Sequence, residues 1–128
     1  MDLRVLLWAA VLGGTGVGLG AFGAHALRGR LDERRLAVFE TGVRYQMYHA
    51  LALFGVAAAV VRLPGTVLPV IAGWCFVAGT LLFSGSLYLL AITNRRGLGA
   101  ITPVGGLAFV IGWVLLAFAT TRALTVVV

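Results

Sequence analysis

Two histidines and their polar neighbours are the residues of this chain best suited to chemistry. His25 closes the first apolar stretch, and His49 follows Tyr45 and Gln46 at the start of the second. Ser84 adds a hydroxyl inside a third apolar stretch. Imidazoles in such places can carry protons, ligate a metal or haem, or bond to backbone carbonyls where helices end. We take His25, Tyr45, Gln46, His49 and Ser84 as a candidate polar cluster.

A structural role competes with every chemical role for this cluster, because boundary histidines commonly serve only as hydrogen-bonded groups. No further Cys, His or carboxylate completes a metal or haem set. No Asp or Glu lies within an apolar stretch to orient a catalytic base. Cys75 is the single cysteine, and its apolar surroundings predict a small hydrophobic residue. We therefore expect no enzymatic activity, no cofactor, and no catalytic or metal-binding residue.

The composition indicates an integral membrane protein. Hydrophobic residues make up 61% of the chain and charged residues 11%, and the mean hydropathy is +1.05. These values lie outside the range of soluble domains. All ten basic residues are arginines, and they stand at the ends of apolar segments, where arginine anchors at lipid headgroups. We expect a lipid environment and no nucleic-acid partner.

Four apolar segments predict an all-α membrane domain over residues 1–128, a four-transmembrane-helix bundle with spans at about 5–26, 45–61, 67–92 and 99–121. A short amphipathic helix is expected at about 32–43, lying in the interface, with Asp32 as its N-cap. The first stretch imitates a signal peptide, but it is longer than the usual apolar region of one. We expect it to remain as a span.

Glycines are frequent in the first span, which holds six of them between Val5 and Ala24. In a soluble helix each would cost about 1 kcal/mol relative to alanine, whereas in lipid they allow neighbouring helices to approach closely. Gly13, Gly16, Gly20 and Gly23 step by three and four and so share one face. We expect this span to be the central helix on which the others dock. Similar packing surfaces are expected at Gly85, Gly105 and Gly106.

Hydroxyl side chains recur at intervals of four in the third span, at Thr80, Ser84 and Tyr88. Such groups commonly bond to a carbonyl of their own helix or to the next helix. We expect this stripe to hold helices together.

Four stretches of the chain, taken in order, carry a family resemblance. They are Leu19–His25, Thr41–Gln46 with His49, Leu82–Tyr88, and Thr102–Gly106 with Gly112 and Trp113. They resemble the YgdD-like family of small bacterial inner-membrane proteins and are similar to the animal transmembrane protein 256. The resemblance implies a four-helix, multi-pass protein of the bacterial cytoplasmic membrane and brings no established activity. The positions that match are His25, Tyr45, Gln46, His49, Ser84, Gly85, Pro103, Gly105 and Gly106.

The arginines also predict an orientation. With four spans, one side holds Arg4, Arg62 and Arg122, and the other holds Arg28, Arg30, Arg34, Arg35, Arg44, Arg95 and Arg96. By the positive-inside rule the second side is cytoplasmic and the termini are outside.

We expect a small scaffold or accessory protein that acts by association with membrane lipid, with copies of itself or with another membrane protein. Its polar cluster would bind a lipid headgroup or a small ligand. An uncoupled transporter or channel for a small solute or ion is the alternative, and a haem or quinone redox protein is a third.

Overall fold

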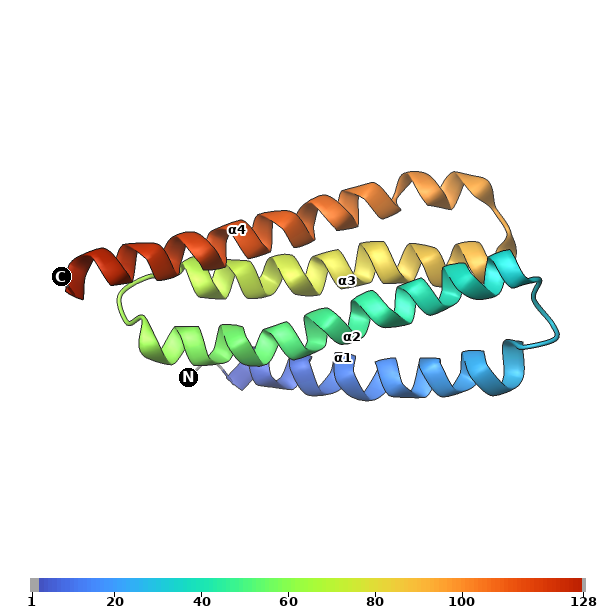
Figure 1. Cartoon of the computed structure of the whole chain (residues 1–128), viewed down its shortest axis with the longest axis horizontal. Coiled ribbons are helices and arrows are strands. Elements are labelled where there is room, and N and C mark those ends of the chain that lie inside the picture. Colours follow the sequence, from blue (N-terminus) through green and yellow to red (C-terminus); the bar gives the residue numbers. More distant parts are fainter. Residues whose placement is uncertain (1–2, 128) are drawn as a thin grey trace.

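The computed structural model describes residues 3–127, which form four long helices joined by short connections. The elements are α1 (Leu3–Phe22), a π-helical turn η1 (Gly23–Leu27), α2 (Glu33–Arg62), α3 (Leu68–Thr93), a 3-10 turn η2 (Arg96–Ala100) and α4 (Thr102–Val127). The helices run alternately up and down in chain order, so α1 begins at the end of the molecule where α4 finishes (Figure 1).

The centre of the structure is formed by α2 and α3, with α1 and α4 on the outside (Figure 1). The large side chains that are almost fully buried come from the two central helices, among them Phe39, Leu53, Val56 and Phe76. The expectation that the glycine-rich first helix is the centre is therefore wrong. Glycines allow close approach on one face only, and that face of α1 meets α2, so α1 lies at one side of the bundle.

The predicted interfacial helix over 32–43 and the predicted span over 45–61 are one continuous helix, α2. The prediction of a separate amphipathic helix is wrong, whereas the predicted cap is confirmed: Asp32 accepts a hydrogen bond from the backbone N–H of Arg35 at 2.8 Å. The apolar face of the segment is covered by protein instead of lipid. Phe39 is buried, 4.9 Å from the ring of Tyr88, and Leu36 packs in the same cluster.

The glycine face of α1 is turned towards α2. A Cβ added at Gly13, Gly16, Gly20 or Gly23 would have a side chain of α2 as its nearest neighbour. At Gly23 it would lie 2.9 Å from the ring of Phe39, which is closer than real Cβ atoms approach. The two backbones therefore approach closely along this face.

The other three glycines singled out from the sequence differ in their surroundings. A Cβ at Gly105 would overlap the backbone of Phe83, so α3 and α4 touch there through main chain. At Gly106 it would make ordinary contact, 3.8 Å from the Phe83 ring, and at Gly85 it would meet nothing within 4 Å. Only Gly105 of these three stands where any side chain would force the helices apart.

Three stretches of the described chain are long and apolar enough to cross a membrane: Leu3–Leu27, Leu68–Thr93 and Arg96–Val126. The structure is thus all-helical and contains membrane-competent helices, in agreement with the predicted class.

Candidate functional site

Gln46 is the residue where three helices meet. It lies in the middle of α2, where its side chain is 4% exposed. Its Nε2 donates to the carbonyl of Leu12 and to Oγ1 of Thr15, both at 2.9 Å. Its Oε1 accepts from the hydroxyl of Tyr88 at 2.7 Å. One amide therefore joins α2 to α1 on one side and to α3 on the other.

His49, one turn further along α2, makes the link to α4. Its Nδ1 lies 2.8 Å from the carbonyl of Tyr45, and Nε2 lies 3.2 Å from the indole nitrogen of Trp113. A carbonyl only accepts and an indole N–H only donates, so the proton must be on Nδ1 and the lone pair on Nε2. The ring is held neutral in one tautomer, stacked on Phe109 with centroids 3.5 Å apart. Both nitrogens are in use.

The hydroxyl stripe on α3 behaves as its spacing predicted. Ser84, which is 1% exposed, donates to the carbonyl of Gly42 on α2 at 2.7 Å. Thr80 donates to a carbonyl of its own helix, that of Phe76, at 2.8 Å. Tyr88 reaches Gln46, as described above. The stripe therefore binds α3 to α2 at two levels.

Four of the five predicted cluster residues lie along this central stretch of α2 and α3, and His25 does not. Tyr45 is 37% exposed, and its ring packs on that of Phe83 with centroids 4.6 Å apart. His25 is exposed in η1. Gly13 faces the helical turn that holds His49, so the two histidines are separated by roughly 18 Å along the bundle.

The prediction that placed His25 in one cluster with His49 is therefore wrong. It assumed that the second span starts at residue 45, whereas α2 starts at Glu33. Because α2 starts twelve residues earlier than expected, His49 lies in the middle of this helix. His25 lies at the end of the bundle, in η1.

Sequence reasoning missed Trp113 and Phe109 as members of this site. Both come from α4, and Trp113 is 64 positions from His49 in the chain. Spacing within one helix carries no information about such a partner. The sequence signal that could have found Trp113 was its place beside Gly112 in the family resemblance. In the structure a Cβ at Gly112 would lie 2.6 Å from the Phe76 ring, which marks a close helix contact.

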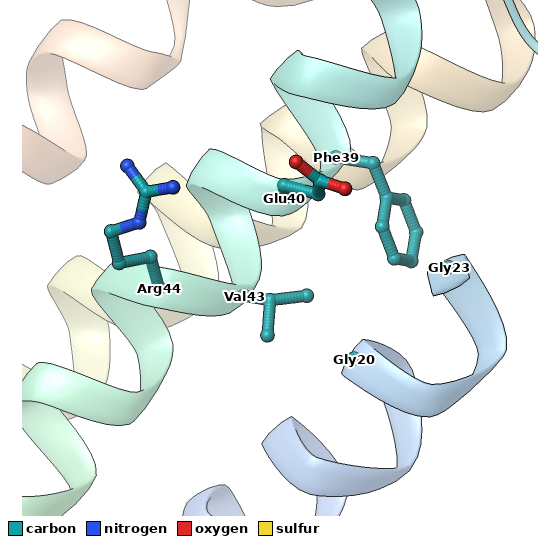
Figure 2. Close-up of a pocket in the computed structure, with 6 residues that line it drawn as sticks. All are labelled: Gly20, Gly23, Phe39, Glu40, Val43 and Arg44. Atoms are coloured by element: carbon teal, nitrogen blue, oxygen red, sulfur yellow. The ribbon is translucent and has the colours of Figure 1, made fainter. Parts of the chain in front are cut away.

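Two cavities with charged residues lie away from this polar core. The first, of about 250 Å³, is shown in Figure 2 between the end of α1 and the first half of α2. The ring of Phe39 points toward Gly23 there, while Glu40 and Arg44 stand one turn apart on α2. The second, of about 530 Å³, lies at the opposite end of the molecule and is lined by Arg62 and Arg122. Neither is lined by Gln46, His49 or Ser84.

A family model described as "Protein of unknown function (DUF423)" matches residues 19–106, more than half of the chain. The chain belongs to the DUF423 family. The matched stretch holds all five residues of the predicted cluster, whereas Trp113 lies beyond it. DUF423 has no assigned activity.

Curated relatives of this DUF423 chain are named as membrane proteins. The "UPF0382 membrane protein YwdK" of Bacillus subtilis is 52% identical over 108 residues, covering 84% of this chain and 88% of the relative. The "UPF0382 membrane protein SH2409" of Staphylococcus haemolyticus is 48% identical, covering 83% and 85%. No solved structure matches the chain. The chain therefore belongs to a family of membrane proteins of unknown function. Its similarity to the YgdD-like family and to transmembrane protein 256 stays a resemblance.

Proposed function

We propose that this DUF423 protein is a multi-pass protein of the bacterial cytoplasmic membrane with four spans, acting by association as a small scaffold or accessory subunit without catalysis. The observation that carries the proposal is the set of hydrogen bonds that its buried polar side chains make. Four of them, Gln46, His49, Ser84 and Ser86, hydrogen-bond to another helix, and the fifth, Thr80, bonds within α3. None of the five lines either charged cavity.

The fourth span in this proposal is α2. Beyond its charged first half, its mean hydropathy is lowered by Gln46 and His49, which are each 4% exposed and hydrogen-bonded to other helices. The bilayer would meet the outward side chains instead, and past Tyr48 the large ones are Leu51, Phe54 and Val61. Polar residues that face the protein interior and are satisfied there are tolerated at membrane depth.

The hydrogen-bond arrangement favours a structural role for the cluster over a ligand role. Among the described residues, no buried side-chain nitrogen or oxygen lacks a partner. Protonating His49 on Nε2 would set two N–H groups against each other at the Trp113 contact. A metal, haem or mobile proton at this ring would first have to break an existing bond.

The proposed partner is a second copy of the chain or another membrane protein. The two outer helices have their outward sides open, and a Cβ added at Gly14 or Gly18 of α1 would meet nothing within 4 Å. Small residues facing lipid allow a further helix to pack closely.

Flux measurements test the proposal. Purified protein is placed in liposomes loaded with a small-ion or a small-solute reporter, beside empty liposomes and liposomes that hold the His49→Ala variant. The expected result is leakage equal to that of empty liposomes. Robust flux that disappears in His49→Ala would overturn the scaffold proposal in favour of a transporter or channel.

A further inference from the structure

The larger of the two charged cavities lies between the α2–α3 connection and the last turns of α4, where the ends of these helices meet. Its volume is about 530 Å³, within the range of small-molecule sites. The side chains that the argument uses are Arg62, Thr66, Leu68, Ala119, Arg122 and Ala123.

The charge on this cavity is positive. Arg62 and Arg122 line it together. Three of the four acidic residues, Asp32, Glu33 and Glu40, stand before or near the start of α2, and the fourth, Asp2, is outside the described residues. Arg62 is the last residue of α2, so roughly 33 Å of helix separates it from Glu40. No carboxylate side chain within residues 3–127 is near enough to neutralise the arginines.

A hydroxyl and apolar walls complete the cavity. Thr66 Oγ1 accepts the backbone N–H of Leu68 at 3.3 Å, so its own hydrogen is free to donate. The guanidinium of Arg122 lies 5.6 Å from the centre of the Phe118 ring, one turn earlier on α4. Leu68 and Ala119 add aliphatic surface.

We propose that this cavity binds the phosphate headgroup of an anionic phospholipid. Guanidinium groups match phosphate oxygens in a planar, paired geometry, and basic pockets between membrane helices suit such headgroups. A free phosphate would leave most of the volume and the aliphatic wall unfilled, which favours a lipid. The assignment rests on the proposed function, since it needs this end of the helices at the level of the headgroups.

Lipid binding by matched variants tests the site. The delipidated protein in a neutral detergent is titrated with phosphatidylglycerol or with phosphatidylcholine, and bound lipid is counted by native mass spectrometry. The Arg62→Gln/Arg122→Gln variant is compared with Arg95→Gln/Arg96→Gln, which removes equal charge from the exposed turn at the opposite end. Phosphatidylglycerol should bind about tenfold or more weakly to the first variant and normally to the second. Equal losses in both variants would overturn the site in favour of diffuse attraction.

A second variant keeps the charge and fills the space. Ala123→Phe places a ring in the cavity with both arginines intact, so phosphatidylglycerol binding should again fall about tenfold. Unchanged binding to Ala123→Phe would overturn the cavity assignment, even if the arginine variant failed to fold. Inorganic phosphate added at the lipid concentration should not compete, and full competition would overturn the lipid in favour of free phosphate. Protein that stays dispersed without detergent would instead contradict the proposed function.

Discussion

Trp113 on α4 donates its indole N–H to Nε2 of His49 on α2 across 3.2 Å. These two helices are separated in the chain by the whole of α3, and each packs chiefly on α3. The bond adds to the stacking of the His49 ring on Phe109, which also joins α2 directly to α4. It also determines the tautomer of His49, because Nδ1 is committed to the Tyr45 carbonyl.

Trp113→Phe and His49→Ala should destabilise the fold to different extents. The first removes one donor and leaves Nε2 unpaired, at a cost of about 1 kcal/mol. The second also removes a ring packed on Phe76 and Phe109, at a cost of about 2–4 kcal/mol. Reversible unfolding in mixed micelles measures both free energies. A Trp113→Phe protein as unstable as His49→Ala would contradict this order.

Gln46 and Tyr88 should be energetically coupled. Tyr88→Phe removes the donor to Oε1 of Gln46, and Gln46→Leu removes the whole junction. In a double-mutant cycle the coupling should be about 0.6–1.7 kcal/mol, the range of side-chain bonds inside membrane proteins. Tyr48→Phe is the control, since Tyr48 lies on the same helix and is 54% exposed. Additive losses in the Gln46 and Tyr88 variants would show that their bond contributes nothing.

Gly105→Ala and Gly85→Ala form a matched pair of substitutions. A methyl group at Gly105 meets the backbone of Phe83, which cannot move aside without separating α3 from α4, so a loss of about 2 kcal/mol or more is expected. At Gly85 the methyl group meets open space, and the change should be neutral or stabilising by up to about 1 kcal/mol. Melting temperatures in detergent compare the two, and equal effects would contradict the packing described for α3 and α4.

Four spans predict which connections share a side of the membrane. After Cys75→Ala, single cysteines are introduced as Arg30→Cys, Thr66→Cys and Gly97→Cys and labelled with an impermeant maleimide in spheroplasts. Positions 30 and 97 should both stay unlabelled because they face the cytoplasm, while position 66 should be labelled from outside. Equal labelling at 30 and 66 would show that α2 does not cross the bilayer.

The membrane class and several local features could be predicted because they depend on residues near one another in the chain. Apolar length and composition indicate membrane helices without any knowledge of packing. Asp32 caps α2 through a backbone N–H three residues away. The spacing of Thr80, Ser84 and Tyr88 places three hydroxyls on one face, and a hydroxyl in an apolar helix has few partners besides a carbonyl or the next helix.

The sequence by itself thus determined that the chain is helical and apolar, and which of its side chains share a helix face. Only the tertiary structure decided which faces are covered. The apolar face around Phe39 could be covered by lipid or by protein, because both are apolar. It is covered by protein because Tyr88 and Gly23, on other helices, lie against Phe39. The hydrogen bond between Trp113 and His49 likewise depends on how α4 packs beside α2. Period and composition describe one helix at a time, whereas burial is a property of pairs of helices distant in the chain.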